Sequence, residues 1–172
     1  GEIHALLGAN GAGKSTLCGI IAGIVEATSA QMQIAGTSYA PRNKAEAERR
    51  GVQIVQQHLR LIETLSIAEN LYLNRLPSKA GVIDRRALRE RARVALLRVG
   101  LGNLDPNASI SRFGVGTRQL IEIASALTRE CQILILDEPT AALTEAEASI
   151  LFEQVRALSL IHISEPTRQH HI

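Results

Sequence analysis

A glycine-rich segment near the start of the chain constrains the fold more than any other feature. Residues 8–15 have the pattern Gly-x-x-x-x-Gly-Lys-Ser. Glycines leave backbone N–H groups uncovered, and the following helix adds its free N-terminal amides and the positive end of its dipole. Such a loop needs a strand before it and a helix after it. The sequence offers an apolar run at 3–7 and a predicted helix at 15–22, so a phosphate-binding P-loop is predicted.

The P-loop pattern assigns a role to individual residues. Lys14 would reach the β- and γ-phosphates of a nucleotide, the Ser15 hydroxyl would ligate Mg²⁺, and the Thr16 N–H would meet the α-phosphate. The remaining positions of the predicted site would supply backbone contacts to phosphate: Gly8, Asn10, Gly11, Ala12 and Gly13. The alternative interpretation is a glycine-rich turn that only joins a strand to a helix. Pattern and context together favour the nucleotide site.

Two acidic residues follow an apolar run in the second half of the chain. Residues 133–136 are continuously apolar, as in a buried parallel strand, and Asp137 and Glu138 come next. Ligands of open α/β sheets bind at the carboxyl ends of the strands. Asp137 would hold Mg²⁺ through water, and Glu138 would orient and deprotonate the water that attacks the γ-phosphate. The alternative, an acidic pair that begins a turn at Pro139, is disfavoured by the P-loop upstream.

Strands and helices alternate around the P-loop, which predicts an α/β fold with a parallel sheet, the P-loop NTPase (RecA-like) core. Further strands are predicted at 31–34 and 52–55, and further helices at 45–50, 117–127 and 144–158. The stretch from about 65 to 116 interrupts this alternation and is mainly helical. It contains a capping-box pattern that starts at Ser66, a loop at 77–81 and a long helix from Asp84 to Val99. We interpret this stretch as an inserted helical subdomain.

Composition narrows the class of protein. The 172 residues, 45% of them hydrophobic, suffice for one core or a core plus a small subdomain. The net charge of +2 does not argue for nucleic acid, and the arginines of the long helix lack interleaved aromatics, so a solvated face is predicted. Cys18 and Cys131 have no metal-ligand spacing and are predicted to be buried, reduced thiols. No apolar run approaches the roughly 20 residues of a membrane span.

Four segments in a fixed order carry a resemblance to a known family. The chain resembles the nucleotide-binding subunit of an ABC transporter, and most of all the N-terminal ATPase domain of bacterial monosaccharide importers. The resemblance spans about residues 1–158. The four segments are the P-loop at 8–16, the Q-loop region at 54–59 and 65–70, the signature motif and helix at 114–124, and the Walker B motif with the D-loop at 136–144.

The resemblance implies further site residues and an ATP-driven dimer. Gln57 would be the Q-loop glutamine, whose amide contacts Mg²⁺ or the attacking water, although by itself it is only a polar residue at a strand end. Gly114, Gly116 and Thr117 would lie at a helix N-terminus that faces the γ-phosphate held by a partner domain. ATP would join the two domains and hydrolysis would release them. Residues 141–143 would form the D-loop at this interface.

The resemblance also implies a domain organisation and partners. The nucleotide-binding domain would comprise a core at about 1–64 and 117–158 and a helical subdomain at about 65–116. Its ligands would be ATP and Mg²⁺. Its partners would be a transmembrane permease subunit, a second nucleotide-binding domain and, indirectly, a periplasmic sugar-binding protein, with no nucleic acid. The expected location is peripheral, on the cytoplasmic face of the bacterial inner membrane.

The sequence departs from the family pattern at several places. Gly114 replaces the usual signature serine, which removes a charge-assisted hydrogen bond of about 1.5–3 kcal/mol, and Thr117 replaces a common glutamine. Residues 159–172 do not resemble the family and look like translated sequencing adapter, so their histidines are predicted to be non-functional. The chain opens on the P-loop strand without Met, which predicts a truncated N-terminus. The adenine-stacking aromatic and the switch histidine are therefore expected outside the authentic segment.

Two other classes of function remain as alternatives. A soluble ABC ATPase that acts on DNA or ribosomes usually has long coiled-coil insertions or basic arms, and the predicted helical insert is short. The importer-like Q-loop region also favours transport. A nucleotide-binding module without catalysis is disfavoured by Glu138, whereas the missing histidine and upstream strand favour a truncated fragment without activity.

Overall fold

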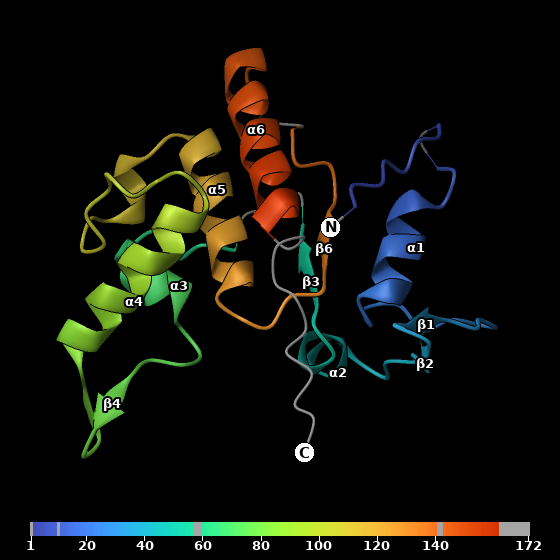
Figure 1. Ribbon diagram of the computed structural model, residues 1–172, viewed down its shortest axis with the longest axis horizontal. Coiled ribbons are helices and arrows are strands. Elements are labelled where there is room, and N and C mark those ends of the chain that lie inside the picture. The colour runs from blue at the N-terminus through green and yellow to red at the C-terminus, as the bar shows by residue number, and fades with distance from the viewer. Residues whose placement is uncertain (1, 10, 57–59, 141–142, 162–172) are drawn as a thin grey trace, which may run out of the picture.

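The computed structural model describes residues 2–9, 11–56, 60–140 and 143–161. At its centre β3 (Val52–Val55) and β6 (Ile133–Leu136) pair in parallel, with Val52 opposite Ile133 and Val55 opposite Leu136. Figure 1 shows α1 (Lys14–Ile21) on one side of this pair, whereas α4 (Arg85–Arg98) and α5 (Val115–Leu127) lie on the other. The register brings both strands to an end at the same edge of the sheet.

The strand predicted at residues 3–7 is wrong. These residues form no strand, and their apolar side chains are exposed, with Ile3 at 56% and Leu7 at 88%. A strand is held by hydrogen bonds to a neighbour, and among the described residues no strand pairs with this run. β6 was expected to be a buried strand, but it pairs on one side only, with β3, and Ile133 at its start is 36% exposed.

Two short hairpins have the same turn chemistry. β1 (Gln33–Ile34) and β2 (Thr37–Ser38) are joined by Ala35 and Gly36, and β4 (Ser78–Lys79) and β5 (Val82–Ile83) by Ala80 and Gly81. All four turn residues have positive φ, as a type I′ turn requires. The loop predicted at 77–81 is confirmed at its turn, Ala80 and Gly81, but Ser78 and Lys79 form a strand where a loop was expected.

The predicted helices of the middle region are confirmed, with ends shifted by one or two residues. α3 (Ile67–Leu71) begins with the predicted capping box, and the Asp84 carboxylate caps α4. The residues that share the apolar face of this helix are at most 5% exposed: Leu88, Ala92, Ala95 and Val99. The remaining helices are α2 (Lys44–Arg49), the 3-10 helix η1 (Ile110–Arg112) and α6 (Glu145–Ile161).

The main apolar core is continuous between the predicted subdomain and the sheet. It joins Ile67 of α3, Leu96 of α4 and Ile121 of α5 to Val55 of β3 and Leu151 of α6. A smaller cluster contains Tyr39, Ala47 and Val52. The large core thus holds α5 against the sheet and positions its N-terminus. In the part of the chain that the structure describes, no helix has the length and apolar character needed to cross a membrane.

Candidate functional site

The glycines of the P-loop adopt the backbone conformation that the predicted loop needs. Gly11 and Gly13 have φ of +82° and +89°, in the left-handed region that side chains disfavour. Between them the Ala12 N–H donates to the Ala9 carbonyl at 3.1 Å. α1 begins directly afterwards at Lys14, so its first amides face the loop. Asn10 lies outside the described residues.

The Lys14 ammonium folds back across this loop. Its Nζ donates to the carbonyl oxygens of Gly8 and Ala9, each at 2.9 Å. These contacts are exposed and neutral at the acceptor, so they are weaker than a hydrogen bond to an anion. Lys14 is therefore placed where it can exchange backbone carbonyls for phosphate oxygens.

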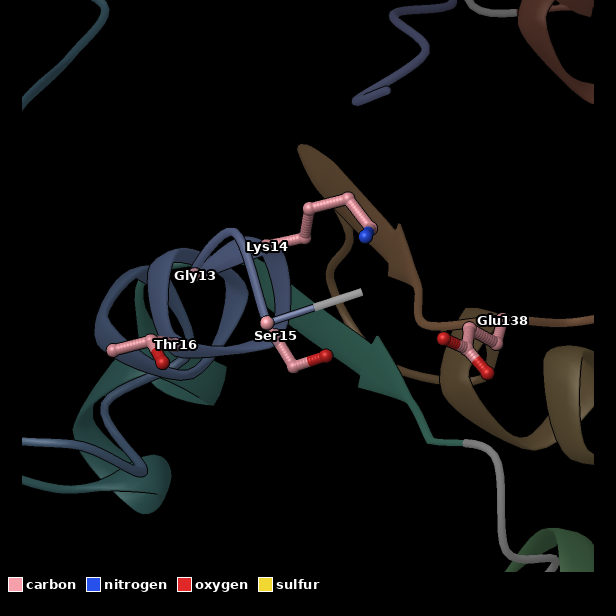
Figure 2. A pocket seen from close by; sticks show the side chains of 6 residues that line it. Gly13, Lys14, Ser15, Thr16 and Glu138 are labelled. Carbon is pink, nitrogen blue, oxygen red and sulfur yellow. The ribbon is translucent and has the colours of Figure 1, made fainter. Parts of the chain in front are cut away.

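The P-loop and the residue after Asp137 line one pocket. This pocket has a volume of about 240 Å³ and is lined by Gly11, Gly13, Lys14, Ser15, Thr16 and Glu138. Figure 2 shows the Glu138 carboxylate across the pocket from the Ser15 hydroxyl. Residues predicted independently from two ends of the sequence thus meet at one place.

Ser15 also contacts Asp137, the residue before Glu138. The Ser15 hydroxyl donates to Asp137 Oδ1 at 3.3 Å. Asp137 is held at the end of β6 because its N–H donates to the Val55 carbonyl at 3.0 Å. The Ser15 hydroxyl offers a hard oxygen donor, which Mg²⁺ prefers, and the Asp137 carboxylate beside it can hold a water of an ion that keeps several waters. The pair therefore fits a magnesium ion that keeps other positions for water and phosphate.

Glu138 has an unusual backbone conformation. Its φ of +48° lies in the left-handed region, where a non-glycine residue is strained. Strain of this kind persists where the surroundings hold it, and it clusters at functional sites. Here the turn at Glu138 directs the chain away from β6 and presents the carboxylate to the P-loop pocket.

The residues predicted to form the signature motif do not line this pocket. Gly114 is the N-cap of α5, and Gly116 and Thr117 lie in its first turn. The Gly116 N–H donates to Glu147 Oε1 at 3.3 Å. Glu147 was not predicted from the sequence, although the Thr-x-x-Glu pattern from Thr144 to Glu147 is a capping box that could have indicated it.

The two cysteines are free and only half-buried, so the prediction of buried thiols is confirmed in part. Burial and, second, the charge of Asp137 raise the pKa of Cys18, which lies on α1. Burial raises the pKa of Cys131 to about 11. Both thiols are therefore protonated at neutral pH and are poor nucleophiles. Gln57, Ala141 and Ala142 lie outside the described residues.

A comparison with protein families decides the relationship. The sequence model described as "ABC transporter" matches residues 1–141, which include the P-loop, the signature helix, Asp137 and Glu138. The chain belongs to the ABC transporter family.

Curated ABC relatives cover most of this chain. It is 46% identical over 158 residues to the ribose import ATP-binding protein RbsA of Chromobacterium violaceum, across 92% of this chain and 32% of that protein. It is 42% identical over 172 residues to RbsA 1 of Rubrobacter xylanophilus, across 100% and 34%. It is 41% identical to the arabinose import ATP-binding protein AraG of Vibrio parahaemolyticus, across 92% and 31%. The chain spans about a third of the length of these relatives.

Solved ABC structures confirm the fold class. An ATP-binding cassette of an ABC transporter in its ADP conformation matches with a TM-score of 0.73 at 24% identity, across 90% of this chain and 63% of that one. A nucleotide-free ATP-binding cassette matches with a TM-score of 0.74 at 22% identity, across 90% and 64%. The predicted α/β P-loop fold with parallel strands is therefore confirmed.

Proposed function

We propose that this chain is part of a nucleotide-binding domain that binds Mg-ATP and hydrolyses it to drive the import of a monosaccharide. The observation that carries the proposal is that the P-loop and Glu138 line the same pocket. The sugar is inferred from the relatives, which are named for ribose import and arabinose import. We assign this activity to a longer protein of which this chain is a part, since those relatives are about three times as long as this chain.

Binding would begin with the triphosphate entering the P-loop. Lys14 would leave the carbonyls of Gly8 and Ala9 and pair with the β- and γ-phosphates. The backbone amides at Gly11, Ala12, Gly13 and the start of α1, Thr16 included, would donate to phosphate oxygens. Phosphate binding at this step depends on charge and backbone donors and needs no apolar side chains in the pocket.

Ser15 and Asp137 would hold Mg²⁺, with Gln57 as the further ligand that the family resemblance implies. Bound there, the ion would neutralise charge on the β- and γ-phosphate oxygens. Asp137 would act through water, which suits an ion that dehydrates reluctantly. The 3.3 Å between the Ser15 and Asp137 oxygens supports this assignment.

Glu138 would act as the general base. Its carboxylate lines the P-loop pocket, across from the Ser15 hydroxyl, which supports a role on a water beside the bound phosphates. Its carboxylate would orient that water and accept its proton as the bond to phosphorus forms. The leaving group is ADP, so the products are ADP and inorganic phosphate.

The remaining partners follow the family resemblance. ATP would be shared between the P-loop of one domain and the α5 N-terminus, Gly114 to Thr117, of a second nucleotide-binding domain. A permease subunit would carry the sugar, delivered by a periplasmic sugar-binding protein, with the domain at the cytoplasmic face of the inner membrane. No nucleic acid is needed.

Phosphate release tests the role of Glu138. Glu138→Gln should lower the rate at least about 100-fold, because a positioned base contributes about 10²–10⁴, while Mg-ATP affinity measured with a fluorescent analogue stays within about twofold. Glu153→Gln, which removes an exposed carboxylate on α6, is the matched control and should keep the rate. Phosphate release by Glu138→Gln at the parent rate would refute the assignment.

A further inference from the structure

One carboxylate serves two helix N-termini. Glu147 Oε2 accepts from the Thr144 N–H at 3.0 Å and from the Thr144 hydroxyl at 2.9 Å, which caps α6. Glu147 Oε1 accepts from the Gly116 N–H at 3.3 Å, in the first turn of α5. The residue therefore joins the segment that follows Glu138 to the signature helix. The capping box explains the first set of contacts but not the second.

The sequence of α5 makes room for this carboxylate. A Cβ at Gly116 would lie 2.7 Å from Glu147 Oε1 and 2.9 Å from its Cγ, so any side chain there would push Glu147 away. The N-cap residue, Gly114, has no side chain and makes no side-chain cap bond. Glu147 is thus the group that satisfies a free amide of α5, in place of a cap from α5 itself.

Glu147 carries a full charge at this position. Hydrogen bonds from the Thr144 N–H, then the Thr144 hydroxyl, then the Gly116 N–H lower the pKa of Glu147. The carboxylate is therefore ionised at neutral pH, and it faces the positive end of the α5 dipole. An anion approaching the same end meets an occupied N–H and a like charge.

We propose that Glu147 is a positioning residue that sets how strongly the N-terminus of α5 attracts the phosphate of a nucleotide held by a second copy of this domain. This inference rests on the proposed function. The incoming phosphate takes the Gly116 N–H, and Oε1 of Glu147 turns away. The cap on α6 survives this change because the carboxylate contributes to it through Oε2 and not through Oε1. The negative charge of Glu147 raises the ATP concentration at which two domains join.

Three variants separate charge from capping. Glu147→Gln keeps one acceptor oxygen, which can hold the Thr144 contacts that cap α6, but it removes the charge and its amide nitrogen cannot accept from the Gly116 N–H. Glu147→Ala removes the cap as well as the charge. Glu145→Gln removes a charge from the first turn of α6 at an exposed position and is the matched control. All are made in a Glu138→Gln background, so that ATP persists. Analytical ultracentrifugation then gives the Mg-ATP concentration at half-maximal dimer.

We expect Glu147→Gln to lower the Mg-ATP concentration at half-maximal dimer by about threefold to tenfold, since a charge at a helix end changes affinity by about that factor. Glu145→Gln should stay within about twofold of the parent. The gap between the parent and Glu147→Gln should narrow as salt is added, because screening weakens the repulsion. If Glu147 had a purely structural role, Glu147→Gln would dimerise no more readily than the parent, and Glu147→Ala would need more Mg-ATP to dimerise.

Two outcomes overturn the inference while the proposed function stands: a parent and Glu147→Gln that dimerise at the same ATP concentration, or chains that bind a fluorescent ATP analogue but stay monomeric with saturating Mg-ATP. A parent that does not bind the analogue refutes the proposed function itself. Amide resonances of Gly116 and Thr144 show that each variant is folded, and only these and nearby amides should shift in Glu147→Gln.

Discussion

Two regions of the molecule are built in different ways. The packed region, comprising α3, α4 and α5, buries large apolar side chains, and seven of the thirteen residues of α5 are buried. The phosphate-facing region, comprising residues 2–9, 11–13 and α1, is largely exposed, and Gly19 is the one buried residue of α1. In Figure 1 the two regions lie on opposite sides of the β3–β6 pair. Apolar burial organises the first, whereas glycine geometry and polar contacts organise the second.

This difference has a consequence for stability. Burial of apolar surface stabilises the packed region whether or not a ligand is bound. The phosphate-facing region has few such contacts, and its Lys14 and Ser15 side chains are bonded to neighbouring carbonyl and carboxylate oxygens. Regions with few buried contacts open locally at low free energy. We therefore expect a ligand to stabilise the P-loop side far more than the helical side.

The largest expected effect is a cavity in the packed region. Ile121→Ala removes a side chain that is 0% exposed at the centre of α5, and it should lower the free energy of unfolding by about 2–5 kcal/mol. Urea denaturation measures the change. Val94→Ala on α4, where the side chain is 56% exposed, is the control and should change the free energy by less than about 0.5 kcal/mol. Equal effects would show that burial does not distinguish these positions.

Local signals in the sequence predicted the packed region well. The apolar spacing along α4 and the caps at Ser66 and Asp84 act over one helical turn, so they can be read without the rest of the fold. The parallel strands β3 and β6 were also predicted, because each is a short apolar run with a turn signal. At the site, the P-loop and the pair Asp137 and Glu138 were predicted for the same reason.

The failures depend on partners that are distant in the sequence. Residues 3–7 have the composition of a strand, but a strand also needs a neighbour, and composition does not supply one. The Gly116–Glu147 contact joins residues 31 apart, and a capping box predicts only its local half. The β4–β5 pairing was predicted only as a loop, because Ala80 adopts positive φ where a hairpin turn usually has asparagine or glycine.

A second, smaller effect should appear on the phosphate-facing region alone. Mg-ATP at about 100 times its Kd stabilises the bound state by about 2.7 kcal/mol, so hydrogen exchange of α1 amides should slow by up to about 100-fold. Lys14→Ala should abolish most of this protection at the same ATP concentration, because it removes a charge-assisted contact of about 1.5–3 kcal/mol. Amides of α4 should change little. Equal protection in α1 and α4 would mean that the two regions unfold as one unit.

The smallest effect concerns the cap of α3. It tests whether polar contacts in the packed region contribute less to the free energy of unfolding than apolar burial does. The Ser66 hydroxyl accepts from the Glu69 N–H at 3.2 Å and donates to the Glu69 carboxylate at 2.6 Å. Ser66→Ala should lower the free energy of unfolding by about 1 kcal/mol at pH 7, less than the cavity at Ile121. Ser66→Thr retains the hydroxyl and should preserve most of the stability.

The pH dependence of this cap has a definite sign. Hydrogen bonds from the Ser66 hydroxyl and then the Ser66 N–H hold the pKa of Glu69 below its ordinary value of 4.5. A carboxyl with a lowered folded pKa stabilises the fold above its unfolded pKa, and this contribution is lost as the pH falls through the folded value. The difference between the parent and Ser66→Ala in urea denaturation should therefore narrow below pH 4.5. It should not vanish, since the hydroxyl still accepts from the Glu69 N–H when the carboxyl is protonated. A difference that is constant with pH would assign the whole effect to that one backbone bond.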